Sequence, residues 1–231
     1  MRAPVITEHA VEIACHGDGA RFVIGMDEVG RGALAGPVGV GAVRVDAAAL
    51  AAGVDEDVCR IPDGLRDSKE VPVSRRAALA QEVGTWRPEH AVAYASAEEI
   101  DAVGITLALC LAGRRALAEL LRFGPADLVL LDGSHDWLSS PLTLDAALVF
   151  GEAVDVEIPR VRTIVKGDGS VATIAAASVL AKVERDARMQ GLHREMPSYG
   201  WESNAGYGLA AHRAAIAALG ATHHHRRSWA L

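Results

Sequence analysis

The stretch RFVIGMDEVGRGALAGPVGVGAVRV, residues 21–45, carries the strongest structural signals in the 231-residue chain. Its first part, Arg21–Met26, is an apolar run rich in β-branched residues, which predicts a buried strand ending at Asp27–Glu28. A glycine-rich turn follows at Gly30–Pro37, and Val38–Val45 predicts a second strand. The fold therefore begins with two successive strands and a turn between them that can approach a ligand closely.

Downstream, helical patterns alternate with short apolar runs. Two successive strands followed by this alternation indicate an α/β domain with a mixed sheet. We predict a tail at 1–20, a sheet-bearing core at 21–190 and a small helical extension at 191–231. The expected helices are Ser74–Trp86 with Ser74 as N-cap, Ile105–Arg122, Val171–Gln190 and Leu209–Leu219, and the further strands are His90–Ala95, Asp127–Leu131 and Arg160–Val165; Ala47–Leu65 is expected to be a loop with weak helical character, and Pro141–Glu157 is left unassigned.

The composition is that of an ordinary globular protein, half apolar and 23% charged. No stretch is long and apolar enough to cross a membrane, and the first twenty residues lack the order of a signal peptide. Three widely spaced cysteines suggest free thiols and a cytoplasmic location. Although the net charge is −7, residues 160–231 hold ten Lys and Arg against five Asp and Glu, so a nucleic-acid partner remains possible.

The adjacent carboxylates Asp27 and Glu28 are unusual at the end of an apolar strand. Because side chains alternate along a strand, one of the two should point toward the core side. A buried carboxylate is costly without a compensating cation, and a hard divalent ion with oxygen ligands would supply one. A strand that simply ends in a solvated turn would also explain the pair, so both interpretations stay open on these two residues.

The segment Gly30-Arg31-Gly32 combines exposed backbone N–H groups with a guanidinium, which suits a phosphate or the edge of a sugar. It is not a dinucleotide-binding loop, because that fingerprint requires a third glycine opening a helix, whereas Pro37 and a strand follow here.

Two further carboxylates stand at the ends of predicted elements. Asp132 follows a buried strand, and Asp168 precedes a long helix. A turn aspartate and a helix-entry aspartate are the plainer interpretations. Together with Asp27 and Glu28, however, they could converge on one sheet edge and bind the two metal ions of a phosphodiester hydrolase. Asp186 competes for the fourth position, but its spacing from Lys182 favours an ion pair on one helix face.

These residues lie in motifs that resemble those of the ribonuclease HII family. All three lysines of the chain fall inside the matching motifs, which together span about residues 22–229. The motifs are GMDEVGRGALAGPV at 25–38, Asp67-Ser68-Lys69, the segment Ala95–Asp101, Leu131-Asp132-Gly133, Val165–Asp168, the segment Ile174–Asp186 with Ser178 and Lys182, Gly206-Tyr207-Gly208 and His225–Ser228.

The resemblance implies an RNase H-like fold: a mixed central β-sheet flanked by helices, with a C-terminal helical extension. It implies an endonuclease that hydrolyses the RNA strand of RNA–DNA hybrids and incises 5′ to single ribonucleotides in duplex DNA, leaving 3′-hydroxyl and 5′-phosphate ends. Roles in ribonucleotide excision repair and RNA primer removal follow from the same likeness. The implied catalytic and metal-binding residues are Asp27, Glu28, Asp132 and Asp168, with Mg²⁺ or Mn²⁺ as cofactor.

The resemblance also assigns the substrate contacts. Gly30, Arg31 and Gly32 would read the ribonucleotide 2′-hydroxyl and the adjoining phosphate, since the 2′-hydroxyl distinguishes RNA from DNA. Tyr207 would stack on the sugar of the following deoxynucleotide, although a packing aromatic is the plainer interpretation of this residue alone. The remaining expected substrate-binding residues are Lys69, Lys166, Ser178 and Lys182.

Two other functions compete with this one. A ribonuclease HIII-like hybrid nuclease would carry an additional N-terminal substrate-binding domain, for which the twenty residues before the first strand are too few. A non-catalytic hybrid-binding module would be expected to lack at least one carboxylate, and all four are present. We expect a monomer with no evident clamp-binding peptide at Trp229–Leu231. The run His223–His225 is interpreted as part of a basic nucleic-acid face, since neighbouring arginines disfavour a metal there.

Overall fold

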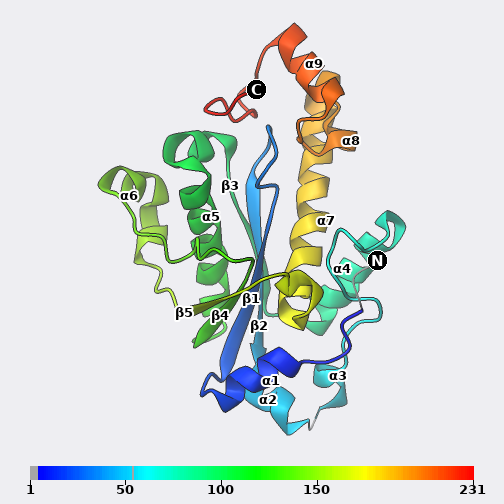
Figure 1. Cartoon of the computed structure of the whole chain (residues 1–231), viewed down its shortest axis with the longest axis vertical. Helices are drawn as coiled ribbons and strands as arrows, with labels where there is room; N and C mark the ends of the chain where they lie inside the picture. The colour runs from blue at the N-terminus through cyan, green and yellow to red at the C-terminus, as the bar shows by residue number, and fades with distance from the viewer. Residues whose placement is uncertain (1–4, 54) are drawn as a thin grey trace.

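A five-stranded mixed sheet lies between two layers of helices in the computed structural model, which describes residues 5–53 and 55–231 (Figure 1). The strand order is β3-β2-β1-β4-β5. β1 pairs antiparallel with β2 and β2 with β3, whereas β4 runs parallel to both β1 and β5. The strands are β1 (Phe22–Val29), β2 (Val38–Asp46), β3 (His90–Ala95), β4 (Leu128–Asp132) and β5 (Arg160–Ile164).

The first strand is longer than the sequence predicts. Its ladder with β2 is continuous from Phe22↔Asp46 to Val29↔Gly39, so the carboxylates lie inside β1 and not at its end. The predicted end at Asp27–Glu28 falls short of the observed one, because the backbone pairing with β2 continues to Val29. This extension fixes both carboxylates in the sheet.

Helices cover both faces of the sheet. α5 packs on one face with the apolar side of β1 and β2, and α7 covers the other face together with α4 (Figure 1). No helix in the part of the chain that the structure describes is long and apolar enough to span a membrane. The helices are α1 (Ala10–Gly17), α2 (Ala47–Ala52), α3 (Glu56–Cys59), α4 (Val73–Trp86), α5 (Ala97–Leu121), α6 (Leu144–Phe150), α7 (Ala172–Glu195), α8 (Trp201–Asn204) and α9 (Ala210–Leu219), with short 3₁₀ turns η1 (Gly151–Asp155), η2 (Gly167–Gly169) and η3 (Pro197–Tyr199).

Several predicted boundaries were wrong for local reasons. α4 begins at Val73 after Pro72, so Ser74 is not its N-cap. α5 begins eight residues before the predicted Ile105 because Ser96 and Glu99 form a capping box, and Gly104 then interrupts the helix with φ +78°. The predicted loop Ala47–Leu65 contains α2 and α3, each capped by an aspartate side chain.

The N-terminal helix and the C-terminal helices lie at opposite ends of the sheet (Figure 1). The predicted N-terminal tail contains α1, while its first four residues lie outside the described part. At the other end, α8 and α9 form the expected helical extension around the upper part of α7. The predicted boundary at residue 191 falls within α7, so this helix is common to the core and the extension. The division into domains stays a prediction.

Candidate active site

Asp27 and Asp132 lie side by side on neighbouring parallel strands. The register Met26↔Leu131 places the following residue of each strand at the same level. Leu130 packs with Ile174 of α7, and side chains two residues apart share a face, so Asp132 points to the α7 side. Asp27 lies on that side as well and is buried, whereas Glu28 is only partly buried. The expected alternation of the Asp27–Glu28 pair is therefore confirmed.

Asp168 is brought to the same place by the turn before α7. It lies in η2 and is 8% exposed, and its backbone N–H donates to Asp132 Oδ1 at 3.2 Å. Lys166, at the start of this turn, holds a left-handed backbone with φ 58°. Such a conformation is uncommon for a residue with a side chain, and its cost is offset by the contacts that the turn makes. The exposed Lys166 side chain lines the cavity beside Asp132 and Asp168.

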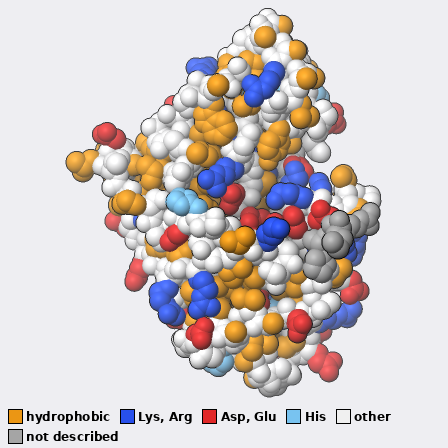
Figure 2. Space-filling model, in the orientation of Figure 1, with side chains coloured by type: hydrophobic (Ala, Val, Ile, Leu, Met, Phe, Trp, Pro, Cys, Tyr) orange, Lys and Arg blue, Asp and Glu red, His pale blue; other side chains and the backbone are white. Residues whose placement is uncertain are grey.

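The carboxylates destabilise one another's charge. Burial raises the pKa of Asp27 well above its usual value, and the charges of Asp132, Glu28 and Asp168 raise it further, against a hydrogen bond from Ser178. Burial and the charge of Asp132 likewise raise the pKa of Asp168. A positive charge placed among these groups would therefore be bound favourably. In Figure 2, acidic side chains gather just below the α8–α9 part, with Lys and Arg on either side.

Lys69 supplies part of that positive charge. Its Nζ lies 3.7 Å from Asp168 Oδ2, and its side chain lines the cavities on both sides of the carboxylates. Burial alone would lower the pKa of Lys69, but the charges of Asp67, Asp27 and Asp168 outweigh it and raise the pKa. The ammonium is thus held charged beside the carboxylates.

The donor set fits a divalent metal by its chemistry. All four predicted ligands offer carboxylate oxygens, which hard cations prefer, and burial and like charge raise the pKa values of Asp27 and Asp168. As the side chains stand, no group of three or more His, Cys, Asp or Glu in residues 5–53 and 55–231 is close enough to hold an ion. Side-chain rotation would be needed to complete a site.

The glycine-rich loop and Tyr207 meet beside the carboxylates. A cavity of about 450 Å³ is lined by residues from β1, the following loop, α4, α7 and the segment before α9. Arg31 Nη1 donates to Glu28 Oε1 at 3.3 Å, and the Tyr207 side chain is partly exposed. The structure thereby brings these predicted residues into one place: Asp27, Glu28, Gly30, Arg31, Gly32, Lys69, Ser178, Lys182 and Tyr207 all line this cavity.

Ser178 and Lys182 make contacts within the protein. Ser178 is buried, and its Oγ lies within hydrogen-bond distance of Ser68 Oγ, at 2.9 Å. Lys182 Nζ lies 2.7 Å from Asp186 Oδ1, which confirms the predicted ion pair on α7. Ser68 and Arg76 also line the cavity, although neither was predicted as a site residue. Ser68 could have been found from its place in the Asp67-Ser68-Lys69 motif.

The prediction that His223–His225 belongs to a basic face was wrong for His225. This side chain is 1% exposed, and its Nδ1 accepts from the Thr222 N–H at 2.9 Å while its Nε2 lies 3.2 Å from His212 Nε2. Burial, followed by the charge of His212, lowers the pKa of His225 to about 4. The ring is therefore a neutral packing group at neutral pH.

Arg226, which follows this run, is also fully buried. Its guanidinium donates to Gly30 O at 2.6 Å, to Arg31 O at 2.7 Å and to Gly36 O. These contacts join residues almost two hundred positions apart, which is why local sequence patterns gave no sign of them. Arg226 thus holds the loop that carries Arg31.

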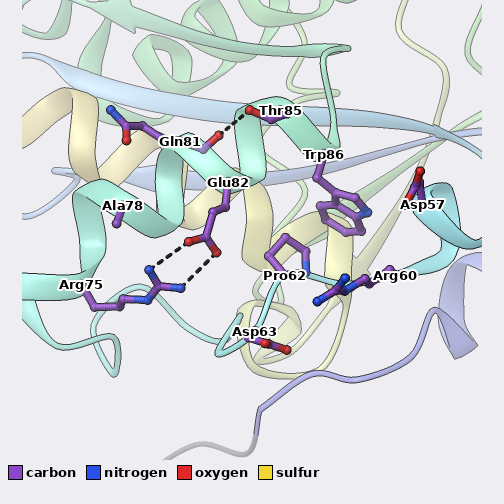
Figure 3. A pocket seen from close by; sticks show the side chains of 10 residues that line it. All are labelled: Asp57, Arg60, Pro62, Asp63, Arg75, Ala78, Gln81, Glu82, Thr85 and Trp86. Atoms are coloured by element: carbon purple, nitrogen blue, oxygen red, sulfur yellow. Dashed lines mark hydrogen bonds and ion pairs between the residues drawn. The ribbon is translucent and has the colours of Figure 1, made fainter.

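A second hollow, of about 580 Å³, lies beside α4 and contains none of the predicted site residues (Figure 3). Arg75 and Glu82 form an ion pair across it at 2.9 Å, and the Thr85 hydroxyl donates to Gln81 O. Its wall also includes Trp86 and Arg60. Since its main charged pair is satisfied internally, we assign the site to the carboxylate cavities instead.

Comparisons with known proteins show which family the chain resembles over its length. The family model for Ribonuclease HII matches residues 24–231. The ribonuclease HII of Streptomyces avermitilis is 45% identical over 212 residues, which cover 92% of this chain and 78% of that protein. The ribonuclease HII of Archaeoglobus fulgidus, solved with PCNA, is 25% identical with a TM-score of 0.61, covering 91% of this chain and 96% of that one. A solved Bst-RNase HIII in complex with Mn²⁺ shares the fold, with a TM-score of 0.60 at 22% identity over 92% of this chain and 66% of that one.

Proposed function

The chain belongs to the ribonuclease HII family and is a ribonuclease H endonuclease, and from that premise we propose that it cuts 5′ to single ribonucleotides in duplex DNA. The observation that carries this proposal is the cavity that Asp27 and Glu28 share with the Gly30–Gly32 loop and Tyr207. Asp132 and Asp168 line the cavity on the other side of Lys69. A site that joins hydrolytic groups to a sugar-reading loop can select a ribonucleotide flanked by DNA. The ends formed would be a 3′-hydroxyl and a 5′-phosphate.

In this proposal Asp27, Glu28, Asp132 and Asp168 would hold divalent ions, either Mg²⁺ or Mn²⁺. Two such ions, when bound, would activate a water molecule and stabilise the leaving oxygen. The solved Mn²⁺ complex of a fold neighbour supports the choice of metal. Asp132 also accepts the Asp168 N–H and so orients the fourth carboxylate. Because burial and like charges make Asp27 a poor anion without a cation, metal binding and its deprotonation would be coupled.

The loop and the aromatic side chain would select the substrate. Backbone groups of Gly30–Gly32 and the Arg31 guanidinium would contact the 2′-hydroxyl and the adjoining phosphate. Tyr207, partly exposed and next to Gly32, would stack on the sugar of the next deoxynucleotide. Lys69 and Lys166 would attract the substrate backbone as positive charges near the cut. Ser178 and Lys182 line the same cavity, and their bonds to Ser68 and Asp186 suit a supporting role beside the substrate. Such an enzyme would serve ribonucleotide excision repair and primer removal.

The test is a cleavage assay on end-labelled duplex DNA that carries one ribonucleotide. An all-DNA duplex and an RNA–DNA hybrid run beside it, each with Mg²⁺, Mn²⁺ or EDTA. We expect metal-dependent incision on the 5′ side of the ribonucleotide and no cutting of all-DNA. Cutting of the hybrid alone would favour the ribonuclease HIII-like alternative. Binding without cutting on every substrate would favour a non-catalytic module.

A further inference from the structure

The Gly30–Gly32 loop contains two glycines with different surroundings. Gly30 has φ +78°, and a Cβ at this position would overlap the Arg185 guanidinium. At Gly32 the nearest atom to an added Cβ would be Tyr207 Cε1 at 3.9 Å. Gly32 therefore borders the open cavity, whereas Gly30 packs directly against the buried side chain of Arg185 from α7.

Arg185 is fully buried and forms no ion pair in the described part of the chain. Its Nε donates to Pro37 O at 2.9 Å, and its Nη1 donates to Ala205 O at 3.0 Å. The first acceptor ends the glycine-rich loop, and the second lies two residues before Tyr207. One guanidinium thus bonds residues that flank both the Gly30–Gly32 loop and Tyr207, in a planar geometry that a lysine cannot reproduce.

Backbone contacts reinforce this connection. Leu34 N and Ala35 N both donate to Gly206 O, at 2.8 and 3.2 Å. Ala205 is held in the left-handed region at φ 49°, an uncommon conformation for alanine that places its carbonyl on Arg185. The loop and the Tyr207 segment are therefore fixed relative to one another at a junction with Arg185 in its centre.

We propose that Arg185 is a positioning residue that sets the distance between the Gly30–Gly32 loop and Tyr207, and thereby the preference for a ribonucleotide followed by DNA. This inference rests on the proposed function. Reading the 2′-hydroxyl requires the loop alone, but sensing the following deoxynucleotide requires the loop and Tyr207 at a fixed separation. Arg185 is fully buried and does not line the cavity, so it would not touch the substrate.

The test compares Arg185→Lys with the wild-type protein and with Arg194→Lys, an exposed arginine on the same helix. We expect Arg185→Lys to lose about 100-fold in kcat/KM on the single-ribonucleotide duplex, the scale of a misplaced site. The loss on a long RNA–DNA hybrid should be less than tenfold, and Mn²⁺ affinity measured by calorimetry should not change. Arg194→Lys should match the wild type in every respect.

Hydrogen exchange measures the positioning independently of catalysis. The amides of Leu34 and Ala35 should exchange faster in Arg185→Lys, whereas those of α4 should not change. Equal losses on both substrates with unchanged exchange would overturn the inference. If Arg185→Lys does not fold, Arg185→Gln, which keeps one amide donor, takes its place. A wild-type enzyme that fails to incise single ribonucleotides would overturn the proposed function, while the exchange experiment would still decide the role of Arg185.

Discussion

Two regions of the molecule carry concentrated charge of opposite sign, and they are built differently. The four carboxylates border open cavities, and burial and like charge raise the pKa values of Asp27 and Asp168. The guanidiniums of Arg185 and Arg226 are fully buried and donate to backbone carbonyls. The carboxylates of the first region border open cavities, whereas the guanidinium groups of the second region bond distant chain segments to one another.

This difference distinguishes charged groups that are suited to bind a ligand from charged groups that hold the fold together. Charged groups that face a cavity and repel one another lower the stability of the free protein in exchange for ligand binding. Buried donors that satisfy carbonyls stabilise one arrangement of loops, and the loss of one leaves those carbonyls unpaired. A substitution in the carboxylate region should therefore affect activity directly, and one in the arginine region should act through the arrangement and stability of the loops.

The largest expected effect is that of Asp132→Asn on activity. We expect the rate of incision to fall by about three orders of magnitude, because Asp132, as a proposed metal ligand, would account for several kcal/mol of transition-state stabilisation. The melting temperature should stay equal or rise in metal-free buffer, since one repulsive charge beside Asp27 is removed. Gel assays with Mg²⁺ and thermal unfolding in EDTA measure the two quantities. If Asp132→Asn is strongly destabilised, Asp132 has a structural role in place of the proposed role in binding metal.

The glycine pair of the loop gives the sharpest contrast in stability. Gly30→Ala should lower the free energy of unfolding by about 2–4 kcal/mol, because the methyl group overlaps Arg185 and the backbone has φ +78°. Gly32→Ala should change it by less than about 1 kcal/mol, because space is open there. Urea unfolding compares the two. Similar losses in both variants would show that Arg185 does not determine the need for Gly30.

The sequence predicted the parts of the molecule that depend on local patterns. Apolar runs located β1 and β2, and the adjacent Asp27–Glu28 pair located one wall of the site. Alternation along β1 also predicted that one of the pair would be buried. The motifs contained Asp132 and Asp168, although only the fold shows that Asp168 donates its N–H to Asp132.

The contacts that the sequence could not predict join distant segments. Arg226 bonds Gly30 and Arg31 across nearly the whole chain, and Arg185 reaches Pro37 and Ala205. One signal was present for Arg185, because it lies four residues after Ala181 and four before Met189, both buried. An arginine on such an apolar stripe indicates a buried charge with several acceptors.

Glu12 is a carboxylate that should contribute to stability and not to activity, as the buried arginines do. It is buried on α1, and its Oε1 accepts from Thr173 N at 2.8 Å and Thr173 Oγ1 at 2.9 Å, although α7 has no side-chain cap of its own. Glu12→Ala should cost about 1–3 kcal/mol of stability by leaving the Thr173 N–H unpaired. Glu12→Gln keeps an acceptor oxygen and should recover most of it in urea unfolding. A full loss of activity in a folded Glu12→Ala would contradict this assignment.

The smallest expected effect concerns pH and His225. Burial and the charge of His212 lower the pKa of His225 from 6.5 to about 4, so between these values the unfolded chain binds a proton that the folded protein does not. The free energy of unfolding should therefore rise with pH across this window and level off above pH 6.5. At pH 6 it should lie less than about 1 kcal/mol below this plateau. In His225→Asn, whose Oδ1 can replace the acceptor for Thr222 N–H, this contribution should disappear from the pH profile of chemical unfolding. If the pH profiles of His225→Asn and the wild type are the same, His225 is not buried in solution as it is in the structure. In that case the segment before Arg226 is held by the two buried guanidinium groups and not by the histidine.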